Sequence, residues 1–422
     1  MTWIPKTDKV SVLGMSAVLV MALLAGTIGL AQGAGEPWMN KSLSPDQRAD
    51  LLLKQMTLGE KIQLAHGSMA FGFPGFPRPK GALGGDGFVR GIPRLGIPDL
   101  QLIGAGVGVT NLGRRVNGQS TALPSSLAEA ASWDPKVAYE FGTVIGKETR
   151  DEGFNVSLGG GIDLARDPRD GRNFEYHGED PILAGTITAR ELRAIQDQDV
   201  VATIKHYAFN DQESGRQTVS ENIDQRSMQE SDLLAFEIGI KESGVGAVMC
   251  AYNRVNGIYS CQNSYLLNDV LKNDWGFKGW VMSDWGATHS TVASALSGLD
   301  EEFYANRYFA GPLMAAVERH DVPESVLDNM VHRILRTMFA NGVFDNPPVV
   351  KPIDFRADAA VAQRVEEQGA VLLKNAGGQL PLKAPSLHSI AVIGAHADVG
   401  VLSGGGSAQV DPVGGNAVPP KG

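Results

Sequence analysis

The sequence lacks the patterns that identify most metal-dependent and cofactor-dependent enzymes. It contains no HExxH pair and no group of cysteine and histidine residues at metal-ligand spacing. The glycine-rich run around Gly404 has no Lys-Ser or Lys-Thr pair to complete a phosphate-binding loop, and the run at 104–109 is not followed by the acidic residue of a dinucleotide site. A GxSxG nucleophile elbow is also missing, which argues against an esterase or peptidase. We therefore expect neither a cofactor nor a metal ion.

An excess of positive charge is missing too. The 422 residues carry 37 Lys and Arg against 47 Asp and Glu, a net charge of −10, so neither a nucleic acid nor an anionic membrane is an expected partner. Hydrophobic residues make up 43% of the chain and low-complexity runs are absent, which predicts an ordinary globular protein. The length allows two domains, one of them large enough for an α/β barrel of about 250 residues.

One long uncharged run lies at the amino terminus. Lys6 and Lys9 precede the apolar stretch 10–30, and the small residues Ala31 and Gly33 follow it. This layout predicts a signal peptide over 1–33, cleaved near Gly33, and an exported protein that is periplasmic or secreted. The alternative is an uncleaved membrane anchor, because the run is longer than a usual signal peptide needs. After cleavage no stable membrane anchor is expected.

Cysteine is scarce, with Cys250 and Cys261 alone in the chain. They lie eleven residues apart, with a candidate turn at Asn256-Gly257 between them. In an exported protein an even pair favours a disulfide, and two buried free thiols are the alternative.

Short apolar runs alternate with helical patterns through the first 344 residues. A helix is expected over 43–64, and a long loop over 67–96, where glycine and proline are too frequent for a long helix or a central strand. Further helices are expected near 135–152, 181–197, 227–243 and 264–273, and strands near 156–164, 200–207, 247–252 and 280–284. Strands separated by helices form a parallel sheet, and the repeated alternation predicts a TIM-like (β/α)8 barrel over 34–344.

A second unit is expected after this barrel. The prolines at 347, 348 and 352 place a linker at 345–357. Beyond it, the pattern predicts a helix over 360–373 and a short strand over 390–394. We interpret 358–422 as the start of an α/β sandwich domain that the chain does not complete.

Polar residues follow the predicted strands, where a barrel builds its active site. Asp284 and Trp285 come directly after one strand, and Lys205 and His206 stand at the end of another. A carboxylate beside an indole suits a sugar site, since the indole face can stack on a sugar ring. An Asp at a strand end can equally cap the next helix.

The other candidates are equally open from the sequence. Arg172 belongs to a segment in which Arg166 and Arg169 alternate with acidic residues, so it either binds a ligand or joins a solvated ion-pair loop. Arg216 follows the Lys-His strand, and Tyr252 ends the next strand, where a tyrosine often only packs.

Several long motifs occur in one order, and together they resemble those of glycoside hydrolase family 3, the β-glucosidase and β-xylosidase family. They read RDPRDGRNFEYHGEDP, IKHYAFNDQESGR, VMCAYNRVNGIYSCQNSYLL and WGFKGWVMSDWGATH. The resemblance implies that Asp284 is the nucleophile of a retaining hydrolysis. It also implies that the sugar in the first subsite is bound by a set of surrounding residues, namely Arg172, Lys205, His206, Arg216, Tyr252 and Trp285.

The resemblance implies an exo-acting β-glucosidase that removes terminal β-D-glucosyl residues from oligosaccharides or glucosides. A β-xylosidase and a catalytically impaired sugar-binding relative are the alternatives. Retention needs a second carboxyl group about 5–5.5 Å from the nucleophile. In relatives of the β-glucosidase type that acid comes from the second domain, so we expect it beyond residue 422.

One position departs from the family pattern. The family places a sugar-binding Asp where this chain has Gly104. Loss of such a carboxylate would leave sugar hydroxyls unpaired, at about 1.5–3 kcal/mol for each charged hydrogen bond. Asp86 in the GGDGF segment is the nearby acid that could take its place.

Overall fold

The computed structural model describes residues 36–73, 77–304, 306–394 and 404–415. The expected signal peptide over 1–33 lies outside these ranges. Within them, no helix combines the length and the apolar character needed to cross a membrane. The domain boundaries at 344 and 357 remain predictions.

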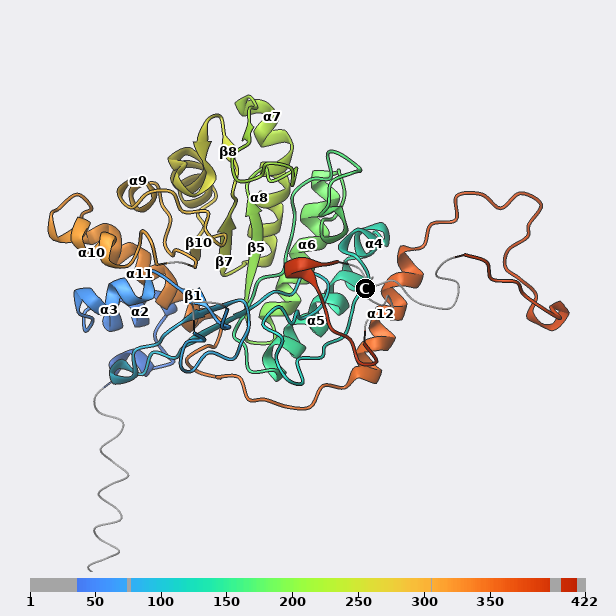
Figure 1. Ribbon diagram of the computed structural model, residues 1–422, viewed down its shortest axis with the longest axis horizontal. Helices are drawn as coiled ribbons and strands as arrows, with labels where there is room; N and C mark the ends of the chain where they lie inside the picture. The colour runs from blue at the N-terminus through green and yellow to red at the C-terminus, as the bar shows by residue number, and fades with distance from the viewer. Residues whose placement is uncertain (1–35, 74–76, 305, 395–403, 416–422) are drawn as a thin grey trace, which may run out of the picture.

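The centre of the molecule is a curled seven-stranded sheet (Figure 1). In spatial order its strands are β1 (Ser68–Met69), β2 (Gly87–Val89), β3 (Leu100–Ile103), β4 (Val156–Ser157), β5 (Val201–Tyr207), β7 (Ala247–Cys250) and β10 (Trp280–Ser283). The pairs from β3 to β10 are parallel, as the alternation of strands and helices predicted. From β2 to β10 all strand residues are buried, which is typical of parallel strands covered on both faces.

Two single bridges bring the edges of this sheet together. Met282 of β10 pairs with Glu301, and Glu302 pairs with His66, just before β1. The segment 301–302 therefore lies between the first and last strands, and the sheet curls as in a TIM-like domain.

One strand runs against the others. β2 is antiparallel to both β1 and β3, and it lies inside the stretch 67–96 that we expected to be a loop without a central strand. That expectation is wrong, because a strand of three residues needs no long apolar run when β3 fixes its register and its side chains are buried. The reversal brings the residue before β2 to the edge at which the parallel strands end.

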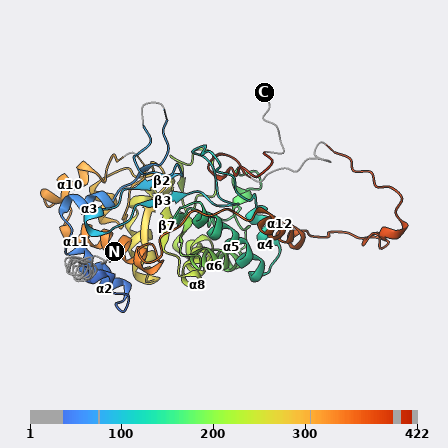
Figure 2. The ribbon, with the colours of Figure 1, turned by 90° about the horizontal axis from the view of Figure 1, so that it is seen from below.

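Helices cover the outside of the sheet (Figures 1 and 2). They are α2 (Pro45–Leu53), α3 (Leu58–Leu64), α4 (Ser126–Ala131), α5 (Pro135–Asp151), α6 (Pro181–Gln196), α7 (Gln225–Glu230), α8 (Asp232–Ser243), the π-helix η5 (Tyr265–Asp274), α9 (Val292–Leu296), α10 (Gly311–Glu318), α11 (Glu324–Ala340) and α12 (Phe355–Gly369). Short 3-10 turns connect them, at η1 (Pro37–Met39), η2 (Pro93–Leu95), η3 (Asn173–Glu175), η4 (Ser260–Gln262), η6 (Ala384–Ser386) and η7 (Gly406–Ala408).

Local start signals explain most helix bounds. Asp180 caps α6 by accepting hydrogen bonds from the backbone N–H groups of Ile182 and Leu183, and Pro181 occupies the first turn. The single helix expected over 43–64 is instead two, since a capping box between Thr57 and Glu60 starts α3. The helix expected near 227–243 likewise divides into α7 and α8 at Ser231.

A small second sheet lies near the end of β7. It joins β6 (Ser220–Glu221), β8 (Arg254–Val255) and β9 (Ile258–Tyr259), with a turn at Asn256-Gly257 between the last two. This turn returns the chain so that Cys250 and Cys261 form a disulfide. The bridge fixes the loop that carries Tyr252.

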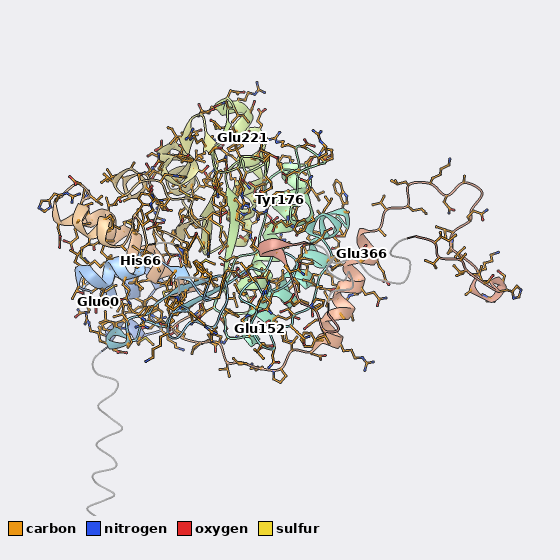
Figure 3. All side chains as sticks on the ribbon, viewed as in Figure 1. Glu60, His66, Glu152, Tyr176, Glu221 and Glu366 are labelled. Atoms are coloured by element: carbon orange, nitrogen blue, oxygen red, sulfur yellow. A yellow bond between two sulfur atoms is a disulfide. The ribbon has the colours of Figure 1, made fainter. Side chains whose placement is uncertain are left out.

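After the barrel, the bounds of the elements differ from those predicted for the sandwich unit. α12 begins inside the predicted linker and packs on α4 and α5, with Val365 buried against the core. Residues 370–394 are exposed throughout and extend away from the barrel, with their side chains spread in solvent (Figure 3). The strand predicted over 390–394 does not form, because no neighbouring strand among the described residues is available to pair with it. Residues 404–415 return to the barrel surface, where Ala408 and Val410 are buried.

Candidate active site

All seven predicted site residues line one cavity of about 260 Å³ at the edge where the parallel strands end. They are Asp284, Arg172, Lys205, His206, Arg216, Tyr252 and Trp285. The volume lies just below the usual range for small-molecule sites, about 300–1,000 Å³, and suits a ligand of few atoms. The sheet topology brings together residues that are as much as 113 positions apart in the sequence.

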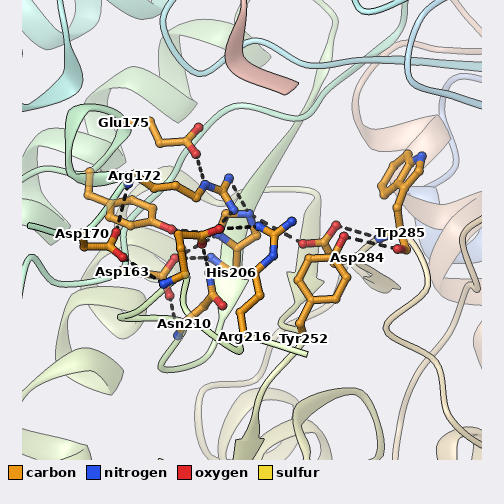
Figure 4. A network of polar contacts seen from close by, with 12 residues as sticks. Asp163, Asp170, Arg172, Glu175, His206, Asn210, Arg216, Tyr252, Asp284 and Trp285 are labelled. Atoms are coloured by element: carbon orange, nitrogen blue, oxygen red, sulfur yellow. Dashed lines mark hydrogen bonds and ion pairs between the residues drawn. The ribbon is translucent and has the colours of Figure 1, made fainter. Parts of the chain in front are cut away.

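Asp284 lies directly after β10 and lines the cavity, next to Tyr252 and Trp285 (Figure 4). Its Oδ1 accepts a hydrogen bond from the backbone N–H of Trp285 at 2.7 Å, and its Oδ2 lies 3.8 Å from Nε2 of His206. Burial raises the pKa of Tyr252, and the negative charge and hydrogen bond of Asp284 raise it further. The phenol therefore stays protonated beside the carboxylate.

His206 is fixed as a neutral ring. Nη2 of Arg172 can only donate, and it lies 3.0 Å from His206 Nε2, so Nε2 is the acceptor and Nδ1 carries the proton. Nδ1 lies 3.0 Å from Oδ2 of Asp163, which also accepts the backbone N–H of His206 at 2.8 Å. Burial and the cations Arg172 and Lys205 hold the pKa of His206 well below its usual value.

Arg172 is held between carboxylates. It hydrogen bonds to Glu175 and lies 3.7 Å from Glu213, which also pairs with Arg216 at 2.7 Å. Arg216 lies over the ring of Tyr252, 4.6 Å from its centroid. These contacts preorganise two guanidinium groups at the cavity, where they can donate to hydroxyl groups.

Lys205 is buried, and this burial lowers its pKa, although the nearby Glu175 opposes the shift. The cavity thus combines cationic donors with the carboxylates of Asp284 and Asp86. A cavity with both hydrogen-bond donors and hydrogen-bond acceptors suits a neutral polyol, because each hydroxyl group can donate and accept.

Trp285 forms one wall of the cavity and is itself supported from behind. Its ring stacks on Phe303 with centroids 4.6 Å apart, and its Nε1 donates to the carbonyl oxygen of Asp86 at 3.1 Å. Leu112, Leu158 and Met249 supply further apolar surface.

The other two arginines of the Arg172 segment lie outside the cavity. Arg166 hydrogen bonds to Asp232, and Arg169 pairs with Asp167 on the exposed surface. The solvated ion-pair interpretation therefore holds for Arg169, whereas Arg166 pairs with the buried Asp232 and Arg172 belongs to the cavity.

Ser407 was not expected at this site. It comes from the carboxyl-terminal glycine-rich run, whose sequence does not match a phosphate loop, yet it lines the same cavity. Backbone hydrogen bonds from Asn111 to Gln409 and from Ser120 to Asp411 hold this segment on the barrel. No local sequence signal connects positions so far apart.

Two family models match the chain. The model described as the glycosyl hydrolase family 3 N terminal domain matches residues 94–337, which is more than half of the chain and contains all seven predicted site residues. The chain belongs to glycosyl hydrolase family 3. The model of the family 3 C-terminal domain matches residues 370–418.

Several curated relatives to which the chain is similar are named β-glucosidases. The chain is 35% identical to a β-glucosidase of Rhizobium radiobacter over 86% of its own length and 42% of that protein. Among solved structures it is similar to β-glucosidase 3B of Thermotoga neapolitana in complex with α-D-glucose, with a TM-score of 0.78 and 33% identity over 87% of this chain and 52% of the other. It is also similar to DesR, a β-glucosidase of Streptomyces venezuelae in complex with D-glucose, with a TM-score of 0.77 and 36% identity over 87% and 47%. The chain thus spans about half the length of these relatives.

Proposed function

We propose that this family 3 chain carries the nucleophile and most of the sugar-binding subsite of an exo-acting, retaining β-glucosidase. The observation that carries this proposal is the position of Asp284. Its carboxylate opens on a cavity lined by Arg172, Lys205 and His206, beside an indole wall. The names of the relatives and the glucose complexes favour a glucoside over a xyloside as substrate.

In this mechanism Asp284 attacks the anomeric carbon of a β-linked glucose. A bond forms from the carboxylate oxygen to that carbon, and the bond to the leaving oxygen breaks as that oxygen takes a proton from a carboxylic acid. Water then attacks the glycosyl-enzyme ester and gives up a proton to the carboxylate that acted as the acid in the first step. Glucose leaves with its anomeric configuration retained. We assign the acid to no residue of this chain.

The surrounding groups would bind the sugar rather than take part in bond changes. The guanidinium groups of Arg172 and Arg216 and the ammonium of Lys205 would donate to hydroxyls, and Asp86 would accept from them. Trp285 would pack on the sugar, since the apolar face of a pyranose suits an aromatic wall.

We also propose that the protein is exported. The disulfide between Cys250 and Cys261 supports this, because such bonds persist in oxidising compartments. The signal-peptide pattern over 1–33 is the second support.

The test is the hydrolysis of an activated aryl glucoside by the 422-residue chain. 2,4-Dinitrophenyl β-D-glucoside has a leaving group that needs little protonation, so it should form the glycosyl-enzyme even if the acid is not supplied by this chain. Hydrolysis of that ester should then limit the rate of turnover. We expect faster turnover than with the matching xyloside, and loss of turnover in Asp284→Asn.

Glucose binding, measured by calorimetry, separates the alternatives. Binding without turnover of the activated glucoside would support the impaired sugar-binding relative, whereas faster turnover of the xyloside would support a β-xylosidase. If the chain neither binds glucose nor hydrolyses the activated glucoside, the proposal is wrong.

A further inference from the structure

A second cluster of chemically active side chains is buried among α4, α6 and the segment after η3, apart from the sugar cavity. Glu129 of α4, Glu191 of α6 and His177, which follows η3, are all fully buried, with exposures of 0%, 1% and 1%. One ligand atom from each lies within 4.8 Å of the others. The proposed hydrolysis uses none of these three groups.

The tautomer of His177 directs a lone pair at the two carboxylates. Nδ1 of His177 lies 3.0 Å from the carbonyl oxygen of Gly161, which can only accept, so Nδ1 carries the proton. In a neutral ring Nε2 is then an acceptor. It faces Oε2 of Glu129 at 3.3 Å and Oε2 of Glu191 at 3.6 Å. Three acceptors facing one another require a cation between them, either a proton or a metal ion.

The two distances from His177 fit a metal ion as well as they fit a long hydrogen bond to a protonated carboxyl group. A charged hydrogen bond from nitrogen to a carboxylate is about 2.7–2.9 Å long, which is shorter than either separation. Bonds of about 2.0–2.2 Å to a tetrahedral zinc ion place neighbouring ligand atoms about 3.3–3.6 Å apart. Both separations fall in that interval.

Buried carboxylate oxygen atoms without hydrogen-bond partners also support a bound metal ion. Oε1 of Glu129 is buried without a hydrogen-bond partner among the described residues, and the carboxylate of Glu191 has only the backbone N–H of Gly160 close to it as a donor. Two carboxylates buried in this way are costly unless their charge is neutralised, and a divalent ion neutralises both. The contact from Nδ1 of His177 to a backbone carbonyl is the outer contact that metal-bound histidines usually make.

We propose that Glu129, His177 and Glu191 bind a divalent transition-metal ion, with Zn²⁺ as the ion the donor set suits best. This reverses the expectation from the sequence that no metal is present. The ion would connect α4 and α6 to the segment that carries Arg172 and Glu175, because His177 lies two residues after Glu175. It would therefore be a structural ion, and the proposal does not depend on the proposed hydrolysis.

The experiment measures the metal content of the chain as printed, purified without a histidine tag from medium containing Zn²⁺. We expect about one Zn²⁺ per chain by mass spectrometry of the elements, retained on dialysis against a chelator at neutral pH. Glu191→Gln should lose the ion. Glu301→Gln is the matched control, since Glu301 is an equally buried carboxylate outside the cluster, and it should keep the ion.

Refolding of the wild-type chain with Co²⁺ gives an independent readout that needs no variant. A tetrahedral cobalt site absorbs visible light strongly, and we expect that band only when Co²⁺ is present during folding. A refolded wild-type chain that holds neither Zn²⁺ nor Co²⁺ would overturn the proposal and leave a proton in the cluster. Retention of the ion by Glu191→Gln would overturn it as well, because the ion would then lie elsewhere.

Discussion

The carboxylate of Asp86 occupies the space beside Gly104. Its Oδ2 accepts a hydrogen bond from the backbone N–H of Gly104 at 2.6 Å and lies 3.3 Å from the place where a β-carbon on residue 104 would stand. Both residues line the cavity. Asp86, the residue before β2, therefore places a carboxylate next to position 104, where the family pattern has an aspartate. The antiparallel direction of β2 accounts for this, because it brings Asp86 to the edge at which β3 ends.

We predict that Asp86 binds sugar hydroxyls in place of an acid at 104. Asp86→Ala should lower kcat/KM for the dinitrophenyl glucoside by roughly 10- to 150-fold, corresponding to about 1.5–3 kcal/mol for a charged hydrogen bond. Gly104→Asp alone should also be impaired, since its β-carbon would lie 2.8 Å from Oγ1 of Thr110 and 3.0 Å from the carbonyl oxygen of Ser407, and its carboxylate would add charge beside Asp86. The double variant Asp86→Gly with Gly104→Asp should recover part of the loss. Unchanged kinetics in Asp86→Ala would contradict this role.

Much of the fold follows from local signals, and the rest depends on contacts between distant residues. Asp180 and Pro181 give the start of α6 within one residue, and the buried run of β5 places Lys205 and His206. β2 was missed because three residues in a glycine-rich stretch become a strand only through their register with β3. The apolar run over 390–394 reads as a strand, but a strand also needs a neighbour, which local sequence does not supply.

The site residues also fall into those that could be predicted from local sequence and those that could not. The residues after the parallel strands could be predicted because barrels bring such ends together. Ser407 could not, since its place depends on how residues 404–415 pack on the barrel.

Arg172 should not tolerate replacement by lysine. Its guanidinium contacts Glu175 and His206 at once, whereas an ammonium group is a single point charge. We expect Arg172→Lys to lower kcat/KM about 100-fold, with glucose affinity falling in parallel, as steady-state kinetics and calorimetry would show. Arg169→Lys is the matched control, because Arg169 pairs with Asp167 on the exposed surface, and it should behave as wild type.

Glu301 should make the protein less stable as the pH rises. Burial raises the pKa of Glu301 to about 8 from the ordinary value of 4.5, so the folded chain holds a proton that the unfolded chain loses between those values. The free energy of unfolding should therefore fall from pH 4.5 to pH 8. Between pH 4.5 and pH 7, the ionisation of Glu301 should lower it by about 3 kcal/mol.

Glu301→Gln removes that ionisation and keeps an oxygen to accept the indole N–H of Trp280. Denaturant unfolding at pH 4.5 and pH 8 should show the variant more stable than wild type at pH 8 and equal to it at pH 4.5. The same difference at both pH values would show that the ionisation of Glu301 is not its cause.

The disulfide should stabilise the edge that carries Tyr252. It closes a loop of sequence separation 11 between β7 and η4, and its removal should cost about 2–3 kcal/mol. Urea unfolding of the chain with Cys250→Ser and Cys261→Ser measures this, and a reducing agent should destabilise the wild type but not the double variant. Equal stability of the wild type with and without the reductant would show that the bridge contributes nothing.

The most direct test of the central claim is covalent trapping of the nucleophile. The chain is incubated with 2,4-dinitrophenyl 2-deoxy-2-fluoro-β-D-glucoside, and the intact protein and its peptides are weighed by mass spectrometry. We predict one fluoroglucosyl group per chain, attached to the peptide that contains Asp284, and none on Asp284→Asn. No adduct on a chain that binds glucose, or an adduct on another residue, would contradict the assignment of Asp284 as the nucleophile.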